Sequence, residues 1–310
     1  MDMLLQIVLL ALGFVMLVKG ADWFVDGSSA VARRFGIPQL VIGLTIVAMG
    51  TSAPEAAVSI TAALQGNAEI TIGNIVGSNI LNILIILGLS SLLSSLAVAK
   101  STIRVEIPFM ILITGVLLLQ GLDGEISLLD GIVLLVLFVV YLGYLFWMAK
   151  KGQEEVQEEA KQHSLLHDLV FMVVGLAIIV LGSKVTVDAA TKLALAIGVS
   201  ERFIGLTIVA LGTSLPELFT SVAAARKGNA DIAIGNIVGS NIFNILFVVG
   251  LSGLIVPVPF VEGFVIDTIV AIAAGVLLGL CCLRKSKLVR WHGVVMLLGY
   301  AAYFVWLLVK

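Results

Sequence analysis

Two nearly identical segments, 162 residues apart, constrain the fold of this chain more than any other feature. IGLTIVAMGTSAPE at residues 42–55 and IGLTIVALGTSLPE at residues 204–217 agree at 12 of 14 positions. IGNIVGSNILNIL at 72–84 and IGNIVGSNIFNIL at 234–246 keep the same offset and agree at 12 of 13 positions. Repetition at one fixed offset indicates an internal duplication. The fold must therefore contain one structural unit built twice.

The composition indicates that this unit lies in a membrane. Of the 310 residues, 60% are hydrophobic and only 12% are charged, and the mean hydropathy is +1.16. A soluble domain is roughly one quarter charged, and a helical membrane crossing needs about 20 mostly apolar residues. The sequence predicts an all-α integral membrane protein with ten transmembrane helices, near residues 3–20, 40–64, 70–93, 105–120, 128–148, 169–182, 203–225, 232–256, 264–282 and 291–309.

The ten predicted helices divide into two repeats of five. We expect a first repeat over residues 1–148, a hydrophilic cytoplasmic linker over 149–166 and a second repeat over 167–310. Because five is an odd number of crossings, the second repeat must enter the membrane from the opposite side. The prediction is therefore an inverted repeat whose broken helices meet at the membrane midplane.

Basic residues predict the orientation of this arrangement. With the amino terminus outside, 14 of the 18 Lys and Arg residues fall on the cytoplasmic side, namely Lys19, Arg33, Arg34, Lys100, Arg104, Lys150, Lys151, Lys161, Arg226, Lys227, Arg284, Lys285, Lys287 and Arg290. Cytoplasmic loops of membrane proteins carry an excess of Lys and Arg. We therefore expect a protein of the cell membrane with both termini outside.

The first repeated motif places a helix breaker inside an apolar run. Proline cannot donate a backbone hydrogen bond, and its ring crowds the carbonyl four residues earlier. Pro54 should therefore free the carbonyl of Gly50, and Pro216 that of Gly212. Freed carbonyls are tolerated in a bilayer only where protein or a wet cavity satisfies them. Both helices should be broken at these prolines.

A carboxylate and two hydroxyl groups accompany each break. Thr51 and Ser52 lie four and three residues before Glu55, so a local helical path predicts that both hydroxyls lie near that carboxylate. The second copy repeats the pattern with Thr213, Ser214 and Glu217. Even on permissive scales, an acidic side chain near the bilayer centre costs roughly 2.5 to 3.5 kcal/mol. Two carboxylates at equivalent positions therefore indicate a functional site.

The second repeated motif predicts a polar stripe on an apolar helix. Asn74, Ser78 and Asn82 follow one another at intervals of four residues, and Asn236, Ser240 and Asn244 repeat them. The GxxxG pairs Gly73/Gly77 and Gly235/Gly239 should let another helix approach closely. We expect mainly structural roles for Asn74, Asn79, Asn236 and Asn241, and structural or entrance roles for Asp22, Asp26 and Asp188.

The predicted site contains only oxygen ligands. Two carboxylates with hydroxyl, amide and carbonyl oxygens suit Ca²⁺, which takes six to eight oxygens, and also smaller monovalent cations; Mg²⁺ is less suited because it dehydrates reluctantly. The histidines lack metal-ligand spacing with each other or with Cys281 and Cys282. Inorganic cations and the lipid bilayer are the expected partners, and we predict no resident cofactor, no nucleic acid, no obligatory protein partner and no enzymatic activity.

GTSAPE and GTSLPE, each followed by GNIVGSNI, resemble the two alpha repeats of the sodium/calcium exchanger family, within the cation/calcium antiporter superfamily. The resemblance covers essentially the whole chain and implies antiport by alternating access, with the first and sixth helices sliding against the rest. It implies Glu55 and Glu217 as shared ligands and the carbonyls of Thr51 and Thr213 as calcium ligands. It also implies Ser52, Ser78, Ser214 and Ser240 as sodium ligands, completed by the carbonyls of Ala48 and Ala210.

One position departs from that family. Sodium/calcium exchangers commonly have Asp where this chain has Asn244, whereas both Asn82 and Asn244 are neutral here, as in the proton-coupled relatives. The large regulatory loop of the animal members is also missing. The leading prediction is exchange of Ca²⁺ for Na⁺, with H⁺-coupled or K⁺-assisted exchange as alternatives and a cation channel as a less favoured one.

Overall fold

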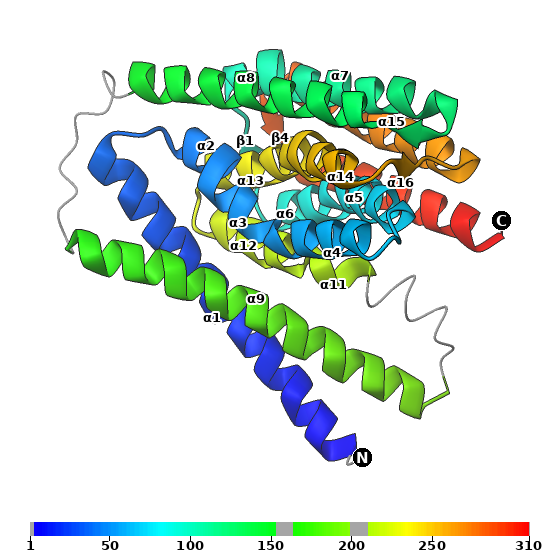
Figure 1. The fold of residues 1–310 in the computed structure, drawn as a ribbon. Helices are drawn as coiled ribbons and strands as arrows, with labels where there is room; N and C mark the ends of the chain where they lie inside the picture. Colours follow the sequence, from blue (N-terminus) through cyan, green and yellow to red (C-terminus); the bar gives the residue numbers. More distant parts are fainter. Residues whose placement is uncertain (1–2, 153–163, 199–209, 310) are drawn as a thin grey trace.

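The computed structural model describes residues 3–152, 164–198 and 210–309, and within these ranges the protein is built almost entirely from helices (Figure 1). In these ranges eight helices are long and apolar enough to cross a membrane, and a bent pair of helices together meets the same criterion. The predicted span at 203–225 lies partly outside the described residues. The structure is thus an all-helical membrane protein, as the composition predicts.

The first half of the chain contains five helical segments. They are α1 (Met3–Phe35); the bent segment α2 (Gln39–Ile42), η1 (Gly43–Val47), α3 (Ala48–Thr51) and α4 (Ala53–Leu64); α5 (Glu69–Leu81), η2 (Asn82–Leu87) and α6 (Gly88–Leu93); η3 (Thr102–Glu106), α7 (Ile107–Gln120) and the short 3-10 turn η4 (Gly121–Asp123); and α8 (Leu128–Gly152). The segments η1, η2 and η3 are π-helical turns.

The second half repeats this order. Its elements are α9 (Leu165–Ala196); α11 (Ala210–Thr213) and α12 (Leu215–Arg226); α13 (Ala230–Phe243), the π-helical η6 (Asn244–Val249) and α14 (Gly250–Ile255); α15 (Glu262–Leu283); and α16 (Arg290–Val309). The π-helical turns η2 and η6 begin and end at positions that differ by the repeat offset of 162. The duplication is therefore preserved in local helix geometry as well as in sequence.

Four two-residue strands qualify the all-α prediction. β1 (Leu96–Ala97) pairs with β4 (Lys287–Leu288), and β2 (Glu125–Ile126) pairs with β3 (Val258–Pro259), both antiparallel. The offset of 162 relates β1 to β3 and β2 to β4, so exchanging the two repeats converts one strand pair into the other. These short pairings were not predicted, because two residues carry no detectable period. They join the two halves at both ends of the bundle.

The helices α1 and α9 form a separate layer, crossing each other outside the main bundle (Figure 1). Glycines permit their close approach: a Cβ added to Gly20 would lie 2.9 Å from the carbonyl oxygen of Gly175, and one added to Gly182 would lie 3.1 Å from that of Gly13. Both helices extend well beyond the predicted spans at 3–20 and 169–182. Those boundaries were too short, because both helices continue past their apolar centres into segments with charged side chains.

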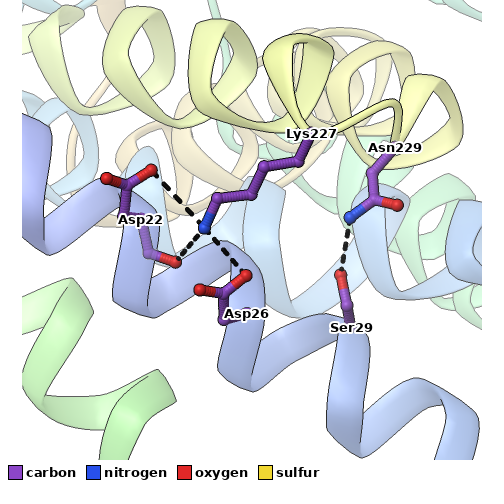
Figure 2. A network of polar contacts seen from close by, with 5 residues as sticks. All are labelled: Asp22, Asp26, Ser29, Lys227 and Asn229. Atoms are coloured by element: carbon purple, nitrogen blue, oxygen red, sulfur yellow. Dashed lines mark hydrogen bonds and ion pairs between the residues drawn. The ribbon is translucent and has the colours of Figure 1, made fainter.

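A polar network attaches α1 to the turn between α12 and α13 (Figure 2). The Lys227 ammonium lies 2.8 Å from Asp26 Oδ1 and 3.4 Å from Asp22 Oδ1, and it donates to the Asp22 carbonyl oxygen at 2.8 Å. Asn229 Nδ2 donates to Ser29 Oγ at 3.1 Å. Asp22 and Asp26 are one helical turn apart, so both carboxylates reach the same ammonium group. The network stabilises the arrangement in which α1 lies against this turn.

The most enclosed helices in the described residues are α5 and α13. Their apolar windows, extended through η2 and η6, are 78% and 94% buried, whereas that of α16 is only 11% buried. Asn79, Asn236 and Asn241 lie in these two helices with almost no exposed surface. The centre of the protein is therefore polar along one line of contact, although the surrounding core is apolar.

Candidate functional site

Each broken helix places a glutamate in the first turn after its break. The helices Gln39–Thr51 and Ala53–Leu64 meet at an angle of 49°, and Ser52 at the junction has φ −82° and ψ 6°. In the second repeat, Ser214 between α11 and α12 has nearly the same geometry, with φ −89° and ψ 4°. Pro54 and Pro216 follow at the start of α4 and α12. The predicted breaks are confirmed, but the prediction that the Gly50 carbonyl is free was wrong, because a backbone N–H at the end of α3 donates to it.

The two glutamates are fully buried and held by hydroxyl groups from the opposite repeat. Ser52 Oγ donates to Glu217 Oε1 at 2.8 Å, and Ser214 Oγ donates to Glu55 Oε1 at 3.2 Å. Ser78 Oγ lies 3.4 Å from Glu55 Oε1 and 3.1 Å from Ser214 Oγ. The two broken helices therefore face each other, and their carboxylates lie in one shared site.

The prediction that each serine hydroxyl lies near the glutamate of its own motif was therefore wrong. Ser52 is the junction residue itself, with ψ near zero, and it lies outside both flanking helices. The helical spacing that would direct its hydroxyl toward Glu55 is therefore interrupted at this residue. The Thr51 hydroxyl likewise contacts Asn236 Oδ1 of the other repeat at 2.9 Å, as well as its own Val47 carbonyl at 3.1 Å.

The asparagines at the start of each polar stripe support the broken helices. Asn74 Nδ2 donates to the Glu55 carbonyl at 3.2 Å and to Ser59 Oγ at 2.9 Å. The second repeat has the same pair of contacts, from Asn236 Nδ2 to the Glu217 carbonyl at 3.3 Å and to Ser221 Oγ at 2.9 Å. Each bond uses an amide donor to satisfy a backbone or hydroxyl oxygen beside the break. These contacts hold the helix that carries the glutamate.

Four further asparagines join the two repeats across the centre. Asn79 and Asn241 each donate to the other's backbone carbonyl at 3.1 Å. Asn82 Nδ2 donates to Asn241 Oδ1 at 2.9 Å, and Asn244 Nδ2 donates to Asn79 Oδ1 at 3.1 Å. Each of these four amide groups thereby donates a hydrogen bond within the protein. The side-chain oxygens of Asn82 and Asn244 keep their acceptor capacity.

Several buried oxygens around this centre have no hydrogen-bond partner within the described residues. They are Glu55 Oε2, Glu217 Oε2, Asn82 Oδ1, Asn244 Oδ1 and Thr213 Oγ1. An ionised carboxylate and an amide carbonyl only accept hydrogen bonds. Buried polar groups normally have partners, so a set of orphaned acceptors in pairs related by the repeat points to a ligand that supplies positive charge.

Two backbone carbonyls near the breaks also bind hydroxyl groups. Ser240 Oγ donates to the Ala48 carbonyl at 3.3 Å, which brings this predicted pair together. The Gly212 carbonyl cannot accept a hydrogen bond from Pro216, which has no backbone N–H. It accepts instead from Ser183 Oγ of α9 at 2.6 Å. Sequence reasoning missed Ser183, because its contact depends on packing between distant helices. Ala210 is the first residue of α11.

The close helix approach predicted from GxxxG is confirmed in the second repeat. A Cβ on Gly235 would lie 3.0 Å from the Gly43 Cα, and one on Gly239 would lie 2.8 Å from the Leu44 carbonyl oxygen. The segment that the repeat offset would place against Gly73 and Gly77 falls outside the described residues. In the described part, therefore, α13 packs directly on the first broken helix.

The fold and the site together are those of a membrane protein in which two similar halves enclose a buried centre. This centre contains paired carboxylates and further oxygen acceptors. The family model described as "Sodium/calcium exchanger protein" matches residues 5–147 and again residues 167–309. The chain therefore belongs to the sodium/calcium exchanger protein family, which consists of membrane transporters.

Relatives of the whole chain agree with this membership. The chain is 39% identical to "Inner membrane protein YrbG" of Escherichia coli, over 98% of this chain and 96% of that protein. It is 33% identical to "Sodium/calcium exchanger MaX1" of Methanosarcina acetivorans, over 96% and 97% of the two chains. A solved structure of the sodium-calcium exchanger NCX_Mj superposes with a TM-score of 0.87 at 36% identity, covering 99% of this chain and 100% of that chain.

Proposed function

We propose that this protein exchanges Ca²⁺ for Na⁺ across the cell membrane. The observation that carries the proposal is the pairing of two fully buried carboxylates, each with one oxygen that has no partner in the described residues. A charge of −2 in an all-oxygen environment suits a divalent cation that takes six to eight oxygen ligands. In the described part of the chain no group of three or more His, Cys, Asp and Glu side chains forms a metal site. Backbone, hydroxyl and amide oxygens must therefore complete the coordination.

We propose the ligands that the resemblance to the exchanger family implies. Glu55 and Glu217 bind Ca²⁺, together with the carbonyls of Thr51 and Thr213. The same glutamates bind Na⁺ in the alternative occupancy, with the hydroxyls of Ser52, Ser78, Ser214 and Ser240, the carbonyls of Ala48 and Ala210, and the amide oxygens of Asn82 and Asn244. The contacts of Ser52, Ser214 and Ser78 with the carboxylates support this assignment, since one set of oxygens then serves both ions in turn.

Competition for shared ligands gives exchange. If Ca²⁺ and Na⁺ use the same two carboxylates, binding one ion releases the other, and the protein loaded with either ion changes the side to which the site opens. We propose that the protein holds these transported ions without a resident cofactor or an obligatory protein partner. This is coupling by mutual exclusion, and it needs both carboxylates in one site.

The proposed architecture is ten transmembrane helices in two inverted five-helix repeats, with both termini outside. The strand pairs and the reciprocal Asn79–Asn241 contacts support a two-fold relation between the halves. An inverted repeat lets the site open to one side and then to the other by moving one group of helices against the rest. The crossed pair α1 and α9 is the group we propose to move, because it packs outside the bundle (Figure 1).

A partial sequence match supports a second candidate, in which K⁺ assists the exchange. A stretch of 64 residues, 21% of this chain, is 56% identical to "Sodium/potassium/calcium exchanger 1" of Homo sapiens, although it covers only 5% of that protein. Without a third carboxylate, the charge of the site rests on Glu55 and Glu217 alone. The coupling ion is therefore the part of the proposal that most needs measurement.

Reconstituted proteoliposomes test the function directly. Uptake of ⁴⁵Ca²⁺ is measured with an imposed outward gradient of Na⁺, K⁺ or H⁺, each against choline at equal osmolarity. We expect uptake with a Na⁺ gradient and none with choline. Uptake driven by H⁺ alone would refute Na⁺ coupling, and uptake that needs K⁺ together with Na⁺ would establish the second candidate. Rapid, gradient-independent equilibration would indicate a channel instead.

A further inference from the structure

A second buried carboxylate lies outside the central site. Glu106 ends the π-helical turn η3, just before α7, and its side chain has no exposed surface. The Tyr144 hydroxyl on α8 donates to Glu106 Oε1. Glu106 Oε2 has no hydrogen-bond partner within the described residues. The exchange mechanism proposed above makes no use of this carboxylate.

Two more buried oxygens without partners surround Glu106. Thr102 lies one turn before Glu106 on η3, on the same side of that turn, and it is fully buried. Tyr141 lies one turn before Tyr144 on α8, so the two tyrosines share one face of that helix, and Tyr141 is 4% exposed. Neither hydroxyl has a hydrogen-bond partner in the described part of the chain. Three orphaned oxygens in one place are unusual, because buried polar groups are normally paired.

Charge excludes a basic side chain as the missing partner. Each ion pair found among the described residues involves Asp22, Asp26 or Asp168, and none reaches Glu106. Arg104, two residues away, is exposed. An ionised carboxylate buried without a counter-charge is strongly unfavourable. When Glu106 is ionised, the site therefore needs a positive charge that no described basic side chain supplies.

The backbone of η3 contributes a further oxygen. The Ile107 N–H donates to the Thr102 carbonyl, which is a π-type bond spanning five residues. Pro108 has no N–H. In a helix, the Ile103 carbonyl would accept from the backbone N–H four or five residues later, at Ile107 or Pro108. The first is already bonded to Thr102 and the second does not exist, so neither is left for this carbonyl. That carbonyl belongs to the same turn as Thr102 and Glu106.

Comparison with the central site makes this turn informative. The other π-helical turns in the described residues are η1, η2 and η6, and all three belong to the broken helices or polar stripes of the central site. Isolated π-helical turns occur often at functional sites, because they shift the directions of side chains and free backbone groups. The turn η3 combines this geometry with a buried carboxylate, as the central site does.

We propose that Glu106, Thr102 and Tyr141 form a second cation site, which binds a small monovalent cation and is held in shape by Tyr144. One carboxylate matches one positive charge, whereas a divalent ion would leave a buried charge uncompensated. A cation with several oxygen ligands satisfies all three orphaned oxygens at once. A proton on Glu106 Oε2 would pair that oxygen with one neighbouring hydroxyl and leave the other hydroxyl without a partner.

The position of the site indicates how it acts. Phe109 stacks on Tyr141 with ring centroids 5.6 Å apart and closes the side toward the middle of α7. The π-turn follows β1, and Lys150 and Lys151 end the same helix that carries the two tyrosines. The site therefore lies near the surface that carries most of the basic residues. It is built from other helices than those that carry Glu55 and Glu217. It binds an ion from that surface independently of transport.

Sodium binding to the full-length protein in lipid nanodiscs tests this proposal. Equilibrium binding of ²²Na⁺ is measured against N-methyl-glucamine for wild type, Glu106→Gln, Tyr141→Phe and Tyr144→Phe, with Glu125→Gln as an exposed carboxylate control at the other end of the α7 hairpin. We expect Glu106→Gln to bind one Na⁺ fewer per chain. Tyr144→Phe should weaken that Na⁺ by about 10- to 100-fold, the usual effect of losing a group that orients a metal ligand.

Infrared difference spectra with and without Na⁺ separate a bound cation from a bound proton. A carboxylate band that shifts with Na⁺ in wild type and is missing in Glu106→Gln supports the site. A carboxylic acid band assigned to Glu106 that is unchanged by Na⁺ overturns it. Unchanged Na⁺ binding in both tyrosine variants also overturns it, and these variants lose only a hydroxyl group. Glu55→Gln should abolish exchange but keep this Na⁺, so failure of the proposed transport function is distinguished from failure of the second site.

Discussion

Replacing Glu217 by Gln removes one of the two central charges while preserving the shape of the side chain. Glu217 is fully buried; its Oε1 accepts from Ser52 at 2.8 Å, and its Oε2 has no partner within the described residues. Glutamine keeps an acceptor for the serine hydroxyl. The perturbation therefore acts mainly on the charge offered to the transported ion, and the protein should remain folded.

The expected effect is larger for Ca²⁺ than for Na⁺. Two unit charges 4 Å apart attract each other by about 4 kcal/mol at an effective dielectric constant of about 20, so a divalent ion gains about 8 kcal/mol. Losing this term costs Ca²⁺ about 4 kcal/mol more than it costs one Na⁺. Since each 1.4 kcal/mol is a factor of ten, the ratio of Ca²⁺ to Na⁺ affinity should fall by roughly a thousandfold.

Binding and flux assays measure this ratio. Equilibrium binding of ⁴⁵Ca²⁺ and ²²Na⁺ is compared in wild type and Glu217→Gln in nanodiscs, and ⁴⁵Ca²⁺ exchange is measured in proteoliposomes. Glu55→Gln should behave alike, because the repeat makes the two carboxylates equivalent. Glu125→Gln, which changes an exposed carboxylate, serves as the control.

Two results would refute the shared site. Near-normal Ca²⁺ exchange in either central variant would show that the carboxylate does not face the ion. An equal loss of Ca²⁺ and Na⁺ affinity would show that the substitution disturbs packing rather than charge. Both outcomes are read from folded protein, which size-exclusion chromatography verifies.

Three further predictions follow from the architecture. Leu64→Cys and Arg226→Cys, at repeat-equivalent and exposed helix ends, should be labelled from outside and inside, respectively, in intact cells; labelling from one side only would contradict the inverted repeat. Asn244→Asp should add an acid-side inhibition of Ca²⁺ transport, because a third carboxylate crowds like charges in a poorly solvated site; an unchanged pH profile with a lowered melting temperature would make Asn244 a packing residue. Lys227→Gln should change the ratio of the Ca²⁺ affinities measured from the two sides of the membrane by up to about fivefold. This factor corresponds to the roughly 0–1 kcal/mol that a partly exposed ion pair contributes. An unchanged ratio would show that the pair does not influence the conformational equilibrium.

The helix breaks and the buried carboxylates could be predicted from sequence, because their causes are local. Pro54 lacks an N–H wherever it occurs in a helix, and Glu55 is costly in any apolar segment. The same reasoning applies to Pro216 and Glu217, and the repeat supplies an independent second observation. Composition fixed the membrane environment in the same way, since apolar length is a property of the chain alone.

The serine contacts could not be predicted, because they depend on the distance between the two repeats. Ser52 lies three residues before Glu55, and the helical spacing favoured a local contact, yet the break turns its hydroxyl toward Glu217. Ser183 has no motif around it, and only the packing of α9 against α11 gives it a partner in Gly212. Glu106 has no motif around it either, because its tyrosine partner is 38 residues away.

The two repeats are nearly identical inside the protein and differ at its periphery, and this difference has a consequence for the proposed mechanism. Exchanging two identical inverted repeats would convert the outward-open state into the inward-open state, so the two states would have equal free energy. Any preference must then come from residues that differ between the repeats. Lys227, which binds Asp22 and Asp26 (Figure 2), corresponds by the offset of 162 to Gln65, and Asp22 corresponds to Lys184. The repeat-equivalent residues Gln65 and Lys184 therefore cannot form the same ion pair at the other end of the α1/α9 layer. The pair stabilises the arrangement in which α1 lies against the α12–α13 turn.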